Sequence, residues 1–524
     1  MFDPVQSVVQ SRFDGPPVEA LRDPQEQTLQ LLQKQLKPNE LAYRRSLLRG
    51  ATRFFGLDIH KEYVTLCAVD ASLDTVVRMT TLSWPRFPAW IEKNLTPDDA
   101  VALEVTTNAW DTIDQLSGHC HSVIAVHPPQ VRLITAMPVM TDKRASEALA
   151  MLLACGLLRP VWVPDAHYRE WRHLVASRHD HVVSLAITKN RLQSILHKHK
   201  IEAPTKKPFA EKLHDWWLAL PLSPVEHLTV RQGLESMAFH MAHIAELEHI
   251  MARELLADER LPLLIQVPGI GLVGAMTILS AVGPIERFPS ERHLVGYSGL
   301  GARVHASGQR YTTGRITKAG RIDLRSAMVT AAHAAKRLNP YWRTEFQQLA
   351  ARIGRNKATV AIARRLLCSV WHILYRREVD RYGEPSRIAE SLLSFIYHEL
   401  RAGDLPNGET ALERVRLMLD QLQIGKELQY VKYGHATLAL PPSSQPGAAP
   451  EAPPEKQGSR RNTRAAREAH KLEAAQRHAD AEAKRLEAEQ RRGRPRKPRS
   501  DKGVKRGKRP TAQAVSAGVS PLAS

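Results

Sequence analysis

The sequence has little of what builds a disulfide-stabilised or membrane-spanning protein. Only four of its 524 residues are cysteines, and no two are spaced as a pair, which excludes a disulfide scaffold and a zinc ribbon. No apolar run reaches the roughly 18 residues of a membrane helix, and the N-terminus lacks the cationic start and apolar core of a signal peptide. Aromatic residues make up only 6% of the chain. We therefore expect a soluble, cytoplasmic protein with no membrane contact, whose cores consist mainly of Ala, Leu, Val and Ile.

Acidic residues are also scarce relative to basic ones. The chain has 74 Lys and Arg against 54 Asp and Glu, a formal charge of +20. Residues from 451 onward contribute 20 basic and 9 acidic residues, so this tail carries +11 and the other 450 residues carry +9. Such an excess predicts a polyanionic partner, most simply nucleic acid. The alternative is a solvated basic tail on an otherwise neutral enzyme.

The order of apolar runs predicts an α/β region followed by helical ones. Runs typical of strands cover 54–59, 63–70 and 75–82, and then come a helix at 87–94, a strand at 100–105, a helix at 109–117 and a strand at 122–127. A three-strand meander followed by alternating helix and strand is the order of a ribonuclease-H-like domain. Long helices at 167–201 and 225–256 predict an antiparallel hairpin or coiled-coil arm, with ordinary bundle packing as the alternative.

These patterns divide the chain into six parts. They are a leading arm at 1–52, an α/β domain at 53–160, a helical coiled-coil linker at 161–260, a helical domain at 261–402, a helical appendix at 403–435 and a disordered basic tail at 436–524.

Three acids fall where a ribonuclease-H-like sheet would bring them together. Asp58 lies inside an apolar strand, Glu104 ends the fourth strand and Asp142 opens a helix. Burying Asp58 costs several kcal/mol unless it binds something positive. Three such carboxylates would hold Mg²⁺ for two-metal phosphoryl chemistry. Taken singly, Asp142 could be a plain helix N-cap and Glu104 a surface residue.

Two segments have the features of backbone phosphate binding. Gly269 and Gly271, in a Pro-Gly-Ile-Gly turn between apolar helices, resemble a helix-hairpin-helix, where backbone N–H groups approach a DNA phosphate; a tight turn within a core is the alternative. The Gly-rich loop at 296–328 surrounds Ser307 with cations that suit phosphate approach. The cations are Arg303, Arg310, Arg315, Lys318, Arg321 and Arg325.

Ser307 could attack a DNA phosphate and hold the strand as a phosphoserine. His305 is a candidate general base, although a Ser-Gly pair is also common in ordinary turns. Far from this loop, Arg492 and Arg494 belong to an Arg-Gly-Arg-Pro segment that resembles an AT-hook, suited to an A·T-rich minor groove. Nonspecific phosphate binding by the tail is the alternative.

Together these segments resemble one family, the IS110 group of insertion-sequence transposases, relatives of the Piv DNA invertases. The resemblance rests on FGLDIHKEYVTLCAV, VALEVTTNAWDTIDQL and TDKRASEALAMLLACGLLRPVWVP, and then on LIQVPGIGLVGAMTIL and GYSGLGARVHASGQRYTTGRITKAGRIDLRSAM. It covers roughly residues 53–380. The leading arm and everything past about residue 400 lie outside it.

The resemblance implies a DEDD-type RuvC-like nuclease domain, a coiled-coil linker and a transposase domain with a nucleophilic serine. In this sequence Asp58, Glu104 and Asp142 match three of the acids, and Ser307 matches the serine. It further implies Mg²⁺, donor and target DNA, a bridge RNA that selects the target, and a homo-oligomer, either dimer or tetramer. The fourth acid of the family motif is replaced by Ala145, and Glu147 points elsewhere on an ideal helix.

Two other functions remain open on the sequence. One is a Piv-like site-specific DNA invertase, which shares the chemistry but not the arrangement of substrates. The other, suggested by Ala145, is a catalytically decayed relative that only binds nucleic acid.

Overall fold

The computed structural model describes residues 38–129, 131, 141–307, 310–401 and 403–448. Contacts within the chain separate residues 1–451 from residues 452–524. The predicted leading arm and basic tail lie largely outside the described residues, as do Arg492 and Arg494. The helix α2 (Pro38–Ser46) is the first described element. No helix in the described ranges is long and apolar enough to cross a membrane.

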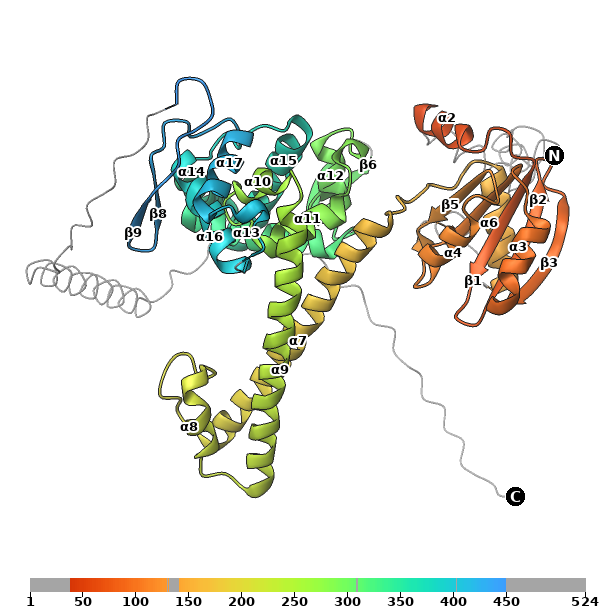
Figure 1. Cartoon of the computed structure of the whole chain (residues 1–524). Helices are drawn as coiled ribbons and strands as arrows, with labels where there is room; N and C mark the ends of the chain where they lie inside the picture. Colours follow the sequence, from red (N-terminus) through yellow and green to blue (C-terminus); the bar gives the residue numbers. More distant parts are fainter. Residues whose placement is uncertain (1–37, 130, 132–140, 308–309, 402, 449–524) are drawn as a thin grey trace, which may run out of the picture. The chain divides into compact units, whose positions relative to one another are not determined.

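A five-stranded mixed sheet forms the N-terminal domain (Figure 1). Its strands are β1 (Arg53–Ile59), β2 (Tyr63–Asp70), β3 (Thr75–Ser83), β4 (Asp99–Glu104) and β5 (Ser122–Val126), in the order β3-β2-β1-β4-β5. The β1–β2 and β2–β3 pairs are antiparallel, whereas β1–β4 and β4–β5 are parallel. The predicted strands and helices are confirmed, and the arrangement is compatible with a ribonuclease-H-like domain.

Helices cover both faces of this sheet. One face packs against α3 (Phe87–Asn94) and α4 (Ala109–Leu116), and the other packs against α6 (Asp142–Ala154). The side chains of a strand alternate between the two faces. Even-numbered residues of β1 and β4, such as Phe54 and Ala102, therefore face α6, and odd-numbered ones, such as Phe55 and Leu103, face α3 and α4.

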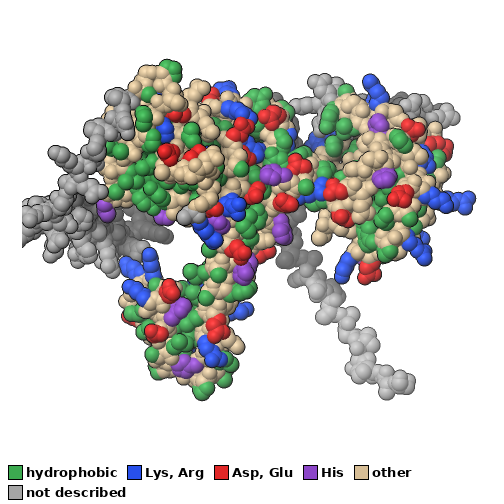
Figure 2. All heavy atoms as spheres, viewed as in Figure 1, with side chains coloured by type: hydrophobic (Ala, Val, Ile, Leu, Met, Phe, Trp, Pro, Cys, Tyr) green, Lys and Arg blue, Asp and Glu red, His purple; other side chains and the backbone are tan. Residues whose placement is uncertain are grey.

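Two long helices form an antiparallel hairpin, as Figure 1 shows, in agreement with the prediction. They are α7 (Ala166–His199) and α9 (Pro224–Leu256), with the short α8 (His214–Leu218) between them. Arg178 of α7 pairs with Glu248 of α9, and Lys198, further along α7, pairs with Glu226, which is earlier in α9. The two helices therefore run in opposite directions. Histidines recur along these helices (Figure 2).

The end of α9 joins a helical domain with one large apolar core. Its helices are α10 (Leu261–Ile265), α11 (Leu272–Val282), α12 (Glu291–Ser298), α13 (Ile322–Leu338), α14 (Pro340–Ile353), α15 (Arg355–Arg376), α16 (Pro385–Glu399) and α17 (Ala411–Gln421). Two hairpins accompany them, β6 (Ala302–Ser307) with β7 (Arg310–Ile316) and β8 (Tyr430–Tyr433) with β9 (Ala436–Ala439).

Two predictions need correction here. The disordered tail does not begin at residue 436, because Ala436–Ala439 forms β9 and Leu440, just beyond it, is buried in the core. The Gly-rich segment around Ser307 is a β-hairpin and not an irregular loop. In the sequence, β-branched and aromatic residues on both sides of Gly308 are a hairpin signal, which the loop-like composition of the segment conceals.

Candidate active site

The structure places the three predicted acids on the same face of the N-terminal sheet. Asp58 continues the series Phe54, Gly56 on β1, so it faces α6. Glu104 ends β4 one residue beyond the parallel Leu57–Leu103 pair, which puts it beside Asp58 in register. Asp142 is the first residue of α6. The acids thus come from the carboxyl ends of two neighbouring strands and the start of the helix that covers them.

Gly56 is what allows α6 to lie so close to β1. A Cβ at Gly56 would stand 1.9 Å from the Ser146 carbonyl oxygen and 2.5 Å from the Ala150 nitrogen. Both neighbours are helix backbone, which cannot rotate away. A glycine two residues before Asp58 therefore brings the start of α6, and Asp142 with it, toward the strand.

Asp142 is not the helix cap. The cap of α6 is Thr141, whose side chain accepts a hydrogen bond from the Arg144 N–H. The Asp142 carboxylate instead accepts a 2.7 Å hydrogen bond from the Tyr63 hydroxyl. The alternative that Asp142 serves only as an N-cap is therefore wrong.

The Asp58 and Asp142 carboxylates repel each other. Burial raises the pKa of Asp58, the Asp142 carboxylate raises it further, and His60 and the Ile59 N–H partly offset both effects. The hydrogen bond to Asp142 likewise raises the pKa of the Tyr63 hydroxyl, with a smaller contribution from Asp58. Asp58, Asp142 and Tyr63 therefore form one electrostatically coupled group.

These residues fit a divalent cation only in part. Carboxylate oxygens are the donors that Mg²⁺ prefers, and a cation would relieve the repulsion between Asp58 and Asp142. Within the described ranges, however, no three His, Cys, Asp or Glu side chains are arranged to hold a metal ion. Glu104 thus shares the face without completing a three-ligand group, and the fourth position is the half-buried Ala145.

Sequence reasoning missed Tyr63 and His60. The β1–β2 turn brings them back beside Asp58, because the His60 N–H bonds to the Tyr63 carbonyl and their rings stack at 4.5 Å between centroids. Two strand-like runs separated by a few polar residues are a hairpin signal. That signal places Tyr63 at the start of β2, close to the end of β1, but does not reveal its contact with Asp142.

Ser307 lies at the tip of the second candidate site. It is the last residue of β6 and pairs across the hairpin with Arg310 of β7. Gly320, at the hairpin's base, has φ +133°, and a Cβ there would meet the Tyr297 carbonyl oxygen at 2.2 Å. Ser307 is therefore at the far end of a two-stranded hairpin, and the segment that follows the hairpin packs against α12 at Tyr297.

Five of the six predicted cations around this hairpin fall into two sets, and the side chain of the sixth, Arg310, is outside the described part of the structure. Arg325 donates to the carbonyls of Ser298 and Lys318, and Arg321 pairs with Asp323, so these two brace the hairpin base. Arg303, Arg315 and Lys318 have exposed side chains, although Arg303 also donates a 3.3 Å hydrogen bond to the Thr317 carbonyl. The exposed set is the one available to a phosphate.

The two glycines of the Pro-Gly-Ile-Gly turn also differ. Gly269 has φ +91°, and a Cβ there would lie 2.5 Å from the Ala331 carbonyl oxygen of α13, so core packing accounts for it. Gly271 precedes α11 and is exposed, and a Cβ added to it would have no heavy atom within 4 Å among the described residues. Of these two glycines, Gly271 is the one that leaves its backbone open to a ligand.

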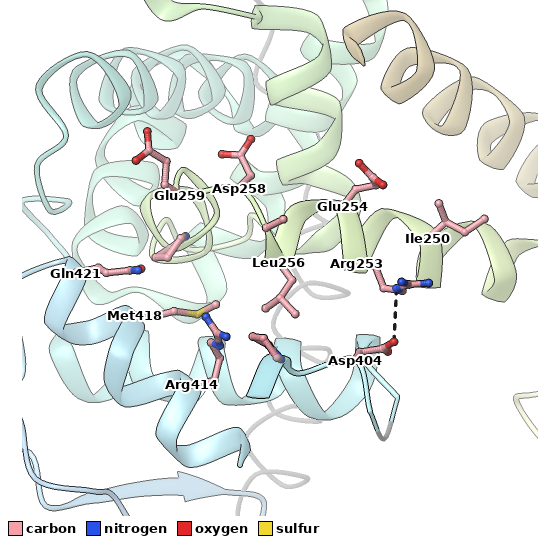
Figure 3. Close-up of a pocket in the computed structure, with 13 residues that line it drawn as sticks. Ile250, Arg253, Glu254, Leu256, Asp258, Glu259, Asp404, Arg414, Met418 and Gln421 are labelled. Atoms are coloured by element: carbon pink, nitrogen blue, oxygen red, sulfur yellow. Dashed lines mark ion pairs between the residues drawn. The ribbon is translucent and has the colours of Figure 1, made fainter. Parts of the chain in front are cut away.

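A cavity of about 610 Å³ lies elsewhere, between the end of α9 and α17 (Figure 3). Arg253 and Asp404 face each other there at 3.7 Å, and Arg414, also in the lining, pairs with Glu409. None of the predicted site residues lines it. The cavity is therefore separate from the candidate active site.

The candidate site residues thus lie in two parts of the chain, the sheet domain with three acids on one face and the helical domain with the Ser307 hairpin. Two family models match this division. One, described as a transposase of the DEDD IS110 type, covers residues 55–201, and the other, described as the transposase IS116/IS110/IS902 family, covers residues 261–347. The chain belongs to the IS110 family of insertion-sequence transposases.

Curated relatives agree with this assignment. The chain is 28% identical over 214 residues to a putative transposase, y4qE, of Sinorhizobium fredii, covering 40% of this chain and 52% of the relative. It is 32% identical over 124 residues to the transposase for insertion sequence element IS1111A of Coxiella burnetii, covering 22% and 33% respectively. A second putative S. fredii transposase, y4pF/y4sB, is 26% identical over 281 residues, covering 53% and 71%. The chain thus spans about half or less of the first two relatives.

Proposed function

We propose that this protein is a DNA transposase that cuts and rejoins DNA through a serine-linked intermediate. The observation that carries the proposal is the coupled pair Asp58–Asp142, held on one face of the sheet by the Gly56 contact, in a chain whose second family domain presents Ser307 on a hairpin. Asp58, Glu104 and Asp142 would hold Mg²⁺. Such an ion stabilises charge on the attacking and leaving oxygens of a phosphoryl transfer.

The protein's own residues would act as follows. The Ser307 oxygen bonds to phosphorus as a phosphodiester P–O bond breaks, and the serine proton passes to a nearby base or to the departing oxygen. The energy of the broken bond is kept in the phosphoserine, so a second DNA end can reverse the step and rejoin. Exposed guanidinium groups such as Arg303 and Arg315 would offset the charge of the five-coordinate phosphorus.

Partners belong to the same proposal. Donor and target DNA are the substrates, a bridge RNA would choose the target by base pairing, and a homo-oligomer would bring the acids of one subunit to the serine of another. The basic excess of the chain supports contact with these polyanions.

The test is a recombination assay with purified protein, RNA transcribed from its flanking sequence, and paired donor and target DNA. A nicked suicide substrate traps the covalent intermediate, which peptide mapping then locates. Wild-type protein should give an adduct at Ser307, and Ser307→Ala should bind both nucleic acids normally but give none. An adduct that persists in Ser307→Ala, or maps to Tyr311, would overturn the serine assignment.

A second candidate, a catalytically decayed relative that only binds nucleic acid, is favoured by two observations. Ala145 replaces the fourth acid, and the described part of the chain contains no three-ligand metal group. Ala145→Asp distinguishes the two: it should raise activity from zero if the site has decayed, and should change an already active enzyme much less.

A further inference from the structure

Basic residues are concentrated in one segment of the helical domain. Residues 301–365 contain 14 Lys and Arg against 2 Asp and Glu, whereas the rest of the first 450 residues has 40 basic and 43 acidic residues. The hairpin cations account for six of the 14. The other eight follow the hairpin, on α13, α14 and α15, where no site has been assigned. They are Lys336, Arg337, Arg343, Arg352, Arg355, Lys357, Arg364 and Arg365.

Four of these eight gather where α13 ends and α15 begins, and we name Lys336, Arg337, Arg343 and Arg355 the cationic cluster. Lys336 Nζ lies 4.3 Å from the centre of the Phe346 ring and donates to the Thr359 hydroxyl at 3.1 Å. The Arg355 guanidinium lies 5.7 Å from the same ring. The Arg343 guanidinium donates to the Arg337 carbonyl oxygen at 2.5 Å.

The cationic cluster has no counter-charge in the part of the chain that the structure describes. Among the described residues, none of its four side chains has a carboxylate within 4 Å, and Glu345, the acid nearest in sequence, is paired with Arg365. Partial burial lowers the pKa of Lys336, and repulsion from Arg355 and Arg337 lowers it further. Several other arginines of this domain are paired with acids, for example Arg377 with Glu259 and Arg387 with Glu384.

We propose that the cationic cluster binds the phosphate backbone of duplex DNA, as a contact surface additional to the serine hairpin; this inference rests on the proposed function. Like charges held together without partners are stabilised by a polyanion, and backbone contacts position a duplex without reading its sequence. Single-stranded nucleic acid is instead recognised through exposed stacking aromatics. Here Phe346 lies beneath Lys336 and is 7% exposed, and Trp342 is 2% exposed, so neither ring offers a stacking face.

The experiment compares two double variants of the full chain in DNA binding. Arg337→Gln/Arg355→Gln removes two charges of the cationic cluster whose side chains make no hydrogen bond or ion pair with the described part of the chain. Arg376→Gln/Arg377→Gln removes the same charge at the opposite end of α15, where both arginines are paired with glutamates. Both are made on an Asp58→Asn background, so that binding is measured without turnover and remains readable even if the proposed chemistry fails.

The slope of log affinity against log salt concentration is the deciding measurement, on a duplex of random sequence and on single-stranded RNA. Loss of two phosphate contacts should reduce the duplex slope by roughly two, while the matched control changes it little. An equal change in both variants would mean that only net charge matters and would overturn the site. Loss of affinity for RNA with unchanged duplex binding would overturn the choice of DNA. Melting temperatures within a degree or so of the Asp58→Asn parent confirm that both variants fold, and Arg343→Gln provides a second cluster variant.

Discussion

Among single residues, Asp58 gives the sharpest expectation because its environment opposes its charge. Burial and Asp142 raise its pKa above that of the unfolded chain. Between the two pKa values the folded state binds more protons than the unfolded state, so the contribution of Asp58 to stability falls as pH rises and is unfavourable at neutral pH. Asp58→Asn removes this cost. The variant should melt at the same temperature as wild type or higher at about pH 7, and lose the advantage toward about pH 4.

Activity and stability therefore separate at this residue. Asp58→Asn should abolish recombination with the fold intact, and melting curves across the pH range against wild type check both parts. A variant that melts several degrees lower and still recombines would show Asp58 to be structural. Asp99→Asn is the opposite case, because Asp99 is fully buried and accepts hydrogen bonds from Arg53. Its loss should lower the melting temperature, at a cost below the roughly 3–5 kcal/mol of breaking a fully buried ion pair, because the Arg53 side chain is partly exposed.

Among elements, the packing of α6 on β1 depends on Gly56. In Gly56→Ala the added methyl would meet the helix backbone at 1.9 Å, so α6 must move outward and carry Asp142 with it. Overpacking of this kind costs about 1–3 kcal/mol, and we expect recombination to fall with stability. Gly296→Ala is the matched control: it lies exposed within α12 with open space around it, and should stabilise by about 0.5–1 kcal/mol. Urea unfolding of both variants checks the contrast, and equal stabilities would contradict the close contact.

In the turn before α11, one glycine serves packing and the other is open to a ligand. Gly269→Ala would force alanine into a positive φ and bring its methyl group against α13. It should therefore destabilise the helical domain by at least about 1 kcal/mol. Gly271→Ala meets nothing and has an ordinary φ of −109°, so its stability should stay within about 0.5 kcal/mol of wild type. If backbone phosphate contact occurs here, Gly271→Ala alone weakens DNA binding without unfolding the domain. Unchanged binding would leave the turn with a packing role only.

These elements also mark how far the sequence can lead. Alternating and apolar runs predict the five strands and the two long helices, because their periodicity records which face is buried. The Gly56 contact and the Tyr63–Asp142 bond could not be predicted, since each joins segments about 80 to 90 residues apart whose packing leaves no local pattern. The Ser307 hairpin is mistaken for a loop on the sequence because its Gly and Arg content outweighs its strand signal. Glu104 lies on the predicted face of the sheet. The sequence does not reveal, however, that the three acids are not arranged as one three-ligand metal group.

At the scale of the whole molecule, charge is divided between the tail and the segment 301–365. The tail has an excess of eleven positive charges and the segment 301–365 an excess of twelve, whereas the remaining chain has slightly more acidic than basic residues. The tail lies outside both family matches, and the basic segment overlaps the second one. This division predicts that the tail supplies nonspecific affinity while the folded part supplies catalysis.

Deleting residues 451–524 tests that division. Fewer counterions would be released on binding, so nonspecific DNA affinity should fall and the salt dependence of binding should flatten. Recombination should survive when DNA is saturating, because the truncated protein keeps Ser307 and all three acids. A second variant shuffles residues 491–499, which keeps their six basic side chains but breaks the Arg-Gly-Arg-Pro order. If the shuffled tail loses a preference for A·T-rich duplexes, the tail reads the minor groove; if it binds as wild type does, its charge alone acts. Loss of recombination by the truncated protein at saturating DNA would contradict the division, because the tail would then take part in the reaction itself.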